Sequence, residues 1–170
     1  MKIPFCTFCV KTRVFCARCQ QLLDSQQYDM TDVDVINALL NIKQRFEEQL
    51  KNVEYVKAYD AGDTIVVVLR GIKSIPRSTI RDMELALEQQ LGKRVRLVEK
   101  SSNISELASQ LAHPARILTV AISWLPDGTS EAVVKIPKWE ARKLPLKPNE
   151  FAKILSMITG TNVRVEVARY

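Results

Sequence analysis

The sequence contains few of the residues on which most active sites and phosphate-binding loops depend. It has one histidine and five scattered glycines in 170 residues. Phosphate-binding loops place several glycines within a few residues, and no such cluster occurs here. His113 has no second histidine or carboxylate beside it, so we interpret it as structural. Because no paired acid and base stand out either, we expect a protein that is not an enzyme and has no small-molecule substrate.

Long apolar runs are also missing. No stretch approaches the ~20 consecutive apolar residues of a membrane span, and the segment Met1–Cys6 lacks the apolar core of a secretory signal. Hydrophobic residues still make up 46% of the chain, which is enough for real cores. We therefore expect a soluble, cytoplasmic protein without a membrane partner. The net charge of +6 is compatible with a polyanionic partner but is too common to demand one.

Four cysteines are the only ones in the chain, and they form the pattern Cys-x2-Cys-x6-Cys-x2-Cys at Cys6, Cys9, Cys16 and Cys19. Two such pairs offer four thiolates to one tetrahedral zinc ion. A pair of disulfides is unlikely in an intracellular chain, whereas an iron–sulfur cluster remains a rival. We expect one structural zinc in a knuckle spanning residues 1–24. So short a segment has almost no core, so metal should supply most of its folding energy.

The rest of the chain contains an internal repeat. Apolar residues at helical spacing precede Gly92, and an alternating strand follows it, with Arg94 and Arg96 expected on an exposed basic face. The same order of helix, glycine and strand recurs around Gly160, 68 residues later. We expect the strand before each helix to repeat at that offset too, with Val66 matching Val134. We expect two related units, residues 31–100 and 101–170.

Both units are expected to follow the order helix, strand, strand, loop, helix, strand. In the first, Leu22–Met30 is a linker and Thr31 caps the opening helix. In the second, Asn103 caps a helix that extends through Leu111. The expected strands are Val53–Tyr59, Thr64–Leu69, Arg116–Trp124, Ser130–Ile136 and Asn162–Ala168. The strand that follows Gly92 is the third strand of the first unit. The expected loops are Gly71–Ser78 and Pro137–Lys147, and Pro148 begins the last helix.

This order resembles the type II KH fold. The phrase Leu-Gly-Lys-Arg-Val-Arg-Leu-Val-Glu-Lys-Ser-Ser at 91–102 is similar to the join between the KH domains of archaeal NusA-like transcription factors, and Leu-Ala-His-Pro-Ala at 111–115 resembles their entry into the second sheet. The resemblance covers Thr31–Tyr170. It implies an α+β fold, in which a zinc knuckle precedes two tandem type II KH-like units. It further implies a non-enzymatic RNA-binding factor in transcription elongation or termination, with nascent RNA and RNA polymerase as partners.

One departure from the family concerns the phosphate grip. KH domains hold nucleic acid at a Gly-x-x-Gly loop, and neither Gly71–Ser78 nor Arg142–Asn149 contains that motif. The loops are basic instead, and Trp139 could stack on a base or fill a core. Lysine and arginine can bind phosphates without reading bases. The candidate nucleic-acid-binding residues are Lys11, Arg13 and Arg18 in the knuckle, Lys73, Arg77 and Arg81 in the first unit, and Lys138, Trp139, Arg142, Lys143 and Lys147 in the second.

Two other functions fit the same features. A ribosome-associated protein could dock on rRNA and a ribosomal subunit through its basic loops and knuckle. A protein–protein adaptor could retain degenerate KH units that no longer bind RNA. The residues do not separate these alternatives, because transcription and translation offer the same phosphates.

Overall fold

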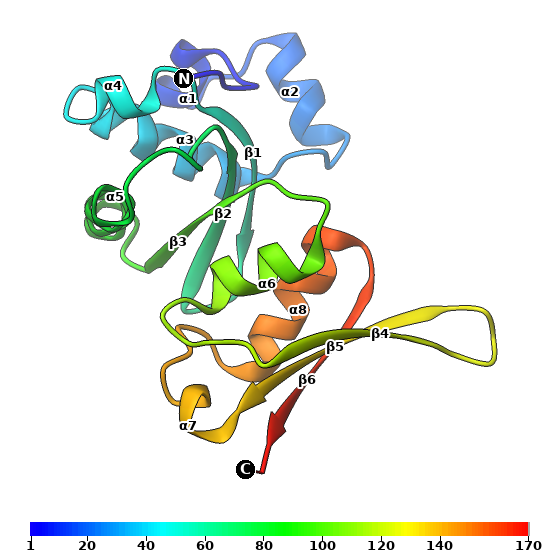
Figure 1. The fold of residues 1–170 in the computed structure, drawn as a ribbon. Coiled ribbons are helices and arrows are strands. Elements are labelled where there is room, and N and C mark those ends of the chain that lie inside the picture. The colour runs from blue at the N-terminus through cyan, green and yellow to red at the C-terminus, as the bar shows by residue number, and fades with distance from the viewer. Residues whose placement is uncertain (170) are drawn as a thin grey trace. The chain divides into compact units, whose positions relative to one another are not determined.

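The structure is a computed structural model that describes residues 1–169, and it confirms the α+β class. The chain divides into two compact units, Met1–Lys100 and Ser101–Tyr170, and each contains one three-stranded sheet with helices over it (Figure 1). Within the described residues, no helix combines the length and the apolar character needed to cross a bilayer.

The first unit begins with four helices. Its elements are α1 (Thr7–Thr12), α2 (Ala17–Asp24), α3 (Met30–Ile42), α4 (Glu47–Leu50), β1 (Glu54–Asp60), β2 (Thr64–Arg70), α5 (Arg77–Leu91) and β3 (Arg94–Glu99). Strand β2 lies in the centre, antiparallel to β1 and parallel to β3. The apolar run at 65–69 is therefore a central strand, which explains why both of its faces are buried.

The second unit repeats that topology. Its elements are α6 (Ile104–Ala112), β4 (Thr119–Trp124), β5 (Ser130–Pro137), α7 (Lys138–Ala141), α8 (Pro148–Thr159) and β6 (Asn162–Ala168). Strand β5 is central, antiparallel to β4 and parallel to β6. Helix α8 packs on α6 and β6, as α5 packs on α3 and β3 in the first unit.

The two units match residue for residue only in part. Helix, glycine and following strand repeat at 68 residues, but Val67 pairs with Leu97 whereas Val134 pairs with Val165. The central strands therefore correspond at 67 residues, and the predicted match of Val66 with Val134 is wrong. Gly92 follows Val67 by 25 residues whereas Gly160 follows Val134 by 26, and this one additional residue accounts for the shift.

Several expected boundaries are also wrong. Helix α2 extends to Asp24, so only a short turn separates it from α3, and the N-cap of α3 is Asp29 rather than Thr31. Asp29 and Asp32 each accept a hydrogen bond from the other's backbone N–H, which forms a capping box. Strand β4 begins at Thr119 rather than Arg116, and the expected loop after Pro137 contains the short helix α7.

The basic face expected for β3 is not exposed at Arg96. This side chain is buried, and burial lowers the pKa of its guanidinium, while Glu84 acts in the opposite direction. Strand β3 lies at the sheet edge, where Glu84 and Glu88 of α5 accept hydrogen bonds from the N–H groups of Leu97 and Val95. The acidic residues of α5 therefore cover the β3 edge. The alternating pattern alone predicts only that the arginines of this strand face solvent.

Gly92 and Gly160 end α5 and α8 as the sequence predicts. Each has φ of 70°, in the left-handed region, and each donates its N–H to the residue four positions earlier, at 2.9 Å. An added Cβ would meet nothing within 4 Å at either position. Any cost of a larger residue there comes from the backbone conformation alone.

We expect Gly92→Ala and Gly160→Ala each to lower the free energy of unfolding by roughly 1 kcal/mol, because alanine disfavours positive φ. Asparagine tolerates this conformation better, so Gly92→Asn and Gly160→Asn should cost less. During urea denaturation, tryptophan fluorescence follows the second unit separately, since both tryptophans, Trp124 and Trp139, lie there. Alanine variants as stable as the parent would contradict the assignment.

Candidate metal centre and nucleic-acid surface

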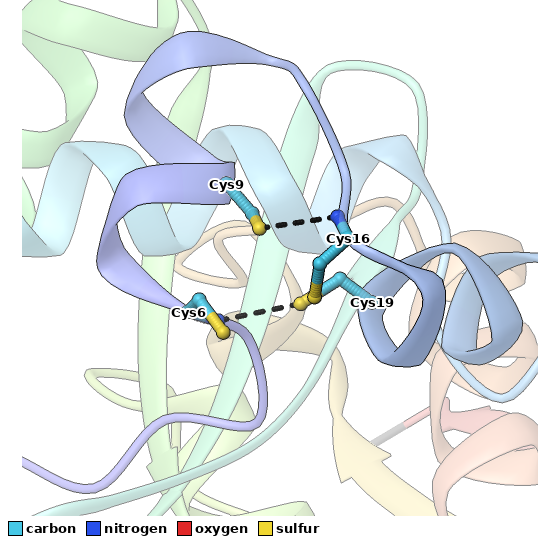
Figure 2. Close-up of side chains that lie close together, drawn as sticks. All are labelled: Cys6, Cys9, Cys16 and Cys19. Carbon is cyan, nitrogen blue, oxygen red and sulfur yellow. Dashed lines mark hydrogen bonds between the residues drawn. The ribbon is translucent and has the colours of Figure 1, made fainter.

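The four cysteines occupy equivalent positions at the starts of two helices. Cys6 is the N-cap residue of α1 and Cys16 that of α2, and the second cysteine of each pair lies in the first turn that follows. A spacing of three residues brings both thiols of a pair to the same helix end. The four Sγ atoms lie within 4.8 Å of one another, so the two helix ends form one cluster (Figure 2).

Backbone N–H groups cross between the two pairs. The N–H of Cys6 donates to Sγ of Cys19 and the N–H of Cys16 donates to Sγ of Cys9, both at 3.4 Å (Figure 2). The guanidinium of Arg18 approaches Sγ of Cys6 at 3.8 Å. Donors directed at sulfur stabilise the thiolate, which is the form that ligates a metal.

The thiols differ in acidity. A hydrogen bond from the backbone of Cys19 is the main cause that lowers the pKa of Cys16 to about 7, whereas burial raises the pKa of Cys19 to about 12. A bound divalent ion deprotonates coordinating thiols, the buried one included. The residues therefore fit a single metal ion. Structural zinc is commonly bound by four cysteine sulfurs, each about 2.3 Å from the ion.

The cysteine segment is joined to the core of the first unit. Phe5, Val10 and two of the cysteines, Cys9 and Cys19, are buried in the same apolar cluster as α3, α5 and the sheet. The expectation that this segment has almost no core is therefore wrong. The segment packs against α3, which its own residues could not indicate.

Among the basic residues of the knuckle, one is already paired and two lie at the surface. Arg13 is exposed too, but it forms an ion pair of 2.6 Å with Asp34 of α3. Lys11 and Arg18 are exposed. Beside Lys11, one helical turn away, Phe8 has 69% of its surface exposed. The sequence analysis missed Phe8, although an aromatic residue between two metal ligands is a usable signal.

In the first unit, the basic loop faces carboxylates of its own chain. Arg81 lies 3.4 Å from Glu84 and 3.5 Å from Glu88, while Lys73 and Arg77 are exposed. The N–H groups of Gly71 and Ile72 donate to the carboxylate of Glu99, at 3.0 and 2.8 Å. The backbone donors that open this loop are thus already occupied.

In the second unit, the basic residues surround an exposed tryptophan. Trp139 in α7 has 62% of its surface exposed, so it does not fill a core. Lys143 pairs with Glu140 at 3.2 Å. By contrast, no carboxylate among residues 1–169 lies within ion-pair distance of Lys138, Arg142 or Lys147, and all three are exposed. This segment offers three unneutralised cations and one aromatic face.

The buried residue Glu140 holds this segment in place. Its carboxylate accepts a hydrogen bond from the N–H of Arg116 at 3.0 Å and also contacts Lys143. These contacts lower its pKa, with the Arg116 N–H as the largest cause. The sequence analysis gave Glu140 no role, because its partner lies 24 residues earlier.

Comparison with known proteins reveals a likeness in fold alone. No protein-family model matches the chain, and no curated protein matches it significantly. Among solved structures, the crystal structure of APE1850 is similar, with a TM-score of 0.50 and 17% sequence identity. The similarity covers 76% of this chain and 96% of APE1850. At this identity the likeness concerns the path of the chain.

Proposed function

We propose that the protein is a non-enzymatic RNA-binding factor of the NusA-like type, with two KH-like units and one structural zinc ion bound by the four cysteines. The strand order supports the KH-like part. In each unit a first strand runs antiparallel to a central strand, and the last strand runs parallel to it after a helix. The helices packed on each sheet fit the same description.

The metal assignment is favoured by the donor set and its compactness. Four sulfurs within 4.8 Å of one another suit a single tetrahedral ion, and a cluster of several irons would need a wider cage. All-thiolate sites of this kind are most often structural zinc sites. The ion would link the N-terminal ends of α1 and α2, each of which supplies two of the four cysteines.

The surface of α7 and its following loop is the observation on which the RNA proposal rests. Lys138, Arg142 and Lys147 present positive charge without a carboxylate partner among residues 1–169, and Trp139 presents a ring among them. Long cationic side chains bind phosphates without reading sequence, and an exposed ring stacks on an unpaired base. Without glycines in the loop, backbone cannot approach phosphates closely, so we expect weak sequence selectivity.

The triple variant Lys138→Gln, Arg142→Gln, Lys147→Gln tests this surface. Each phosphate contact that is lost should lower the slope of log K against log salt by roughly 0.7 for single-stranded RNA, so the slope should fall by about two units. Lys143→Gln added to this set should change little more, since Lys143 already pairs with Glu140. Fluorescence anisotropy with two labelled RNAs of unrelated sequence measures the slopes, and both affinities should fall alike.

A charge-matched control separates local contact from net charge. The variant Lys43→Gln, Lys51→Gln, Lys100→Gln removes the same charge from exposed positions of the first unit and should keep most of the parent slope. Parent-like slopes in the α7 variant would remove this surface from the proposal and leave Phe8, Lys11 and Arg18 as the next candidates. No binding of either RNA by the parent at low salt would refute RNA binding altogether.

The place of action is a separate question. Affinity purification with identification of bound RNA and protein subunits distinguishes the options. RNA polymerase subunits with nascent RNA would support a transcription factor. Ribosomal subunits with rRNA would support a ribosome-associated protein, and a protein partner without RNA would support an adaptor.

A further inference from the structure

The outer strand of the second sheet displays apolar side chains to solvent. Strand β4 lies at the edge of the order β4-β5-β6, and the β4–β5 hairpin extends beyond the helices of its unit (Figure 1). Ile122 is 60% exposed and Trp124 is 77% exposed. Leu118 and Leu125, just outside the two ends of β4, are also exposed. Four large apolar residues thus lie along one short edge.

The backbone of this edge is available for pairing. The N–H of Leu125 donates to the carbonyl of Thr129 across the hairpin, at 2.8 Å. Because backbone groups alternate in direction along an antiparallel strand, the N–H and C=O groups of Val120, Ile122 and Trp124 turn away from β5. The edge therefore presents donors and acceptors beside exposed apolar side chains.

The equivalent edge of the first unit, strand β1, is covered by backbone and carries charged residues. There, Lys2 pairs with β1: its N–H donates to the carbonyl of Val53 at 2.8 Å, and its carbonyl accepts from the N–H of Tyr55 at 2.9 Å. Strand β1 also bears charged residues at Glu54, Lys57 and Asp60. Backbone cover and charge are the usual protection of an edge strand. Strand β4, Thr-Val-Ala-Ile-Ser-Trp, has no charged residue, and no backbone cover from residues 1–169.

We propose that β4 pairs antiparallel with β4 of a second copy of this chain, about a two-fold axis through the middle of the strand. Such a pair contains no like charges, because β4 has no charged residue. Antiparallel pairing centred on Ala121 brings Leu118 of one copy beside Trp124 of the other. It also brings the acidic hairpin tip at Asp127 toward Arg116 at the base of the other hairpin. Both contacts are complementary, and each occurs twice.

Sedimentation of the full chain over a range of concentrations, without nucleic acid, tests the proposal. The parent should form dimers. Ile122→Lys and Ile122→Glu should each weaken dimerisation by at least about tenfold, since each removes an apolar contact and places two like charges at the interface. An equal mixture of the two variants should dimerise again, because the charges are then opposite.

A control in the same unit excludes a general effect of surface charge. Met157→Lys changes an exposed apolar residue of α8 and should dimerise like the parent. Circular dichroism should show native folding in every variant. A parent that stays monomeric at all concentrations, dimers that survive Ile122→Lys, or a mixture that fails to restore them would each overturn the antiparallel β4 pair. None of these outcomes depends on RNA binding.

Discussion

Removing the proposed metal ion should unfold the cysteine segment and destabilise the whole first unit, while the second unit keeps its own transition. Structural zinc contributes ~10–16 kcal/mol of apparent binding energy in finger peptides. Here the loss also exposes Phe5 and Val10, which pack in the core of the first unit. We expect several kcal/mol less stability there. About 3 kcal/mol would lower the melting temperature of a 60–100-residue domain by roughly 12–24 °C.

Cys16→Ser is the variant best suited to test this expectation. Cys16 is the exposed ligand of the four, so its replacement removes a metal donor with little change in packing. Cys19→Ser would also disturb a buried position. Elemental analysis should find one zinc per parent chain and much less in the variant. Thermal melts followed by circular dichroism report both units, and tryptophan emission reports the second alone.

The matched treatment is a chelator added to the parent, followed by excess zinc. Chelation should reproduce the Cys16→Ser melt, and zinc should restore the parent melt but not that of the variant. Stability that is unaffected by chelation would contradict a structural ion. Iron with visible absorbance in place of zinc would contradict the metal assignment, while leaving the four ligands unchanged.

Local sequence signals predicted the parts of the fold that depend on neighbouring residues. Gly92 and Gly160 are read correctly because a helix end needs positive φ within one turn. Pro148 and Asn103 are read correctly for similar reasons: Pro148 is the first residue of α8, and the side chain of Asn103 accepts hydrogen bonds from the N–H groups of Ser105 and Glu106. Each of these signals acts over three or four residues.

Features that depend on distant partners were not visible in the pattern. Arg96 alternates like a surface residue, yet α5 packs along the β3 edge and buries it. Part of the packing around the knuckle comes from α3, beyond the segment itself. The exposed edge of β4 has the same alternation as a buried strand, because periodicity describes the two faces of a strand and not what covers them.

The candidate site divides along the same line. The four cysteines follow from spacing alone, and the structure brings them together. The eleven candidate RNA contacts were chosen by charge and position, and internal ion pairs then separate them. Arg13, Arg81 and Lys143 have carboxylate partners within the chain. Pairing of this kind depends on which helix packs beside a loop, so composition could not reveal it.

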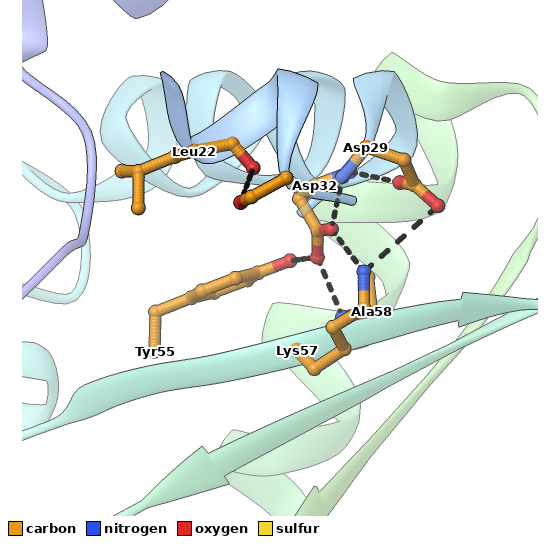
Figure 3. A network of polar contacts seen from close by, with 7 residues as sticks. Leu22, Asp29, Asp32, Tyr55, Lys57 and Ala58 are labelled. Carbon is orange, nitrogen blue, oxygen red and sulfur yellow. Dashed lines mark hydrogen bonds and ion pairs between the residues drawn. The ribbon is translucent and has the colours of Figure 1, made fainter. Parts of the chain in front are cut away.

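Asp32 is the clearest case of a residue whose surroundings are set by tertiary structure. Its position near the start of α3 is explained by the helix dipole, but its side chain is fully buried. The carboxylate accepts hydrogen bonds from the hydroxyl of Tyr55, the ammonium of Lys57 and the N–H groups of Ala58 and Asp29 (Figure 3). It therefore joins the start of α3 to β1.

Replacing Asp32 by alanine should be the most damaging single substitution outside the metal centre. The change removes the Asp32 acceptor from a buried hydroxyl, two N–H groups and a partly buried ammonium, which typically costs about 3–5 kcal/mol. Asp34→Ala, two residues along the same helix, breaks a half-exposed ion pair with Arg13 and should cost less than about 1 kcal/mol. Urea unfolding measures both, and equal costs would contradict this interpretation of the network.

The network also predicts a response to alkaline pH. Burial, and after it the charge of Asp32, raises the pKa of Tyr55 well above its usual value. Tyr55 in the folded protein then retains its proton at a pH where the unfolded chain, with a tyrosine pKa of about 10, loses it. The folded state binds more protons, so stability should fall as the pH rises past about 10. In Asp32→Asn the negative charge is gone, and the decline with pH should be shallower than in the parent. Unfolding curves between pH 8 and about 11 measure both slopes, and identical slopes would show that burial alone determines the pKa of Tyr55.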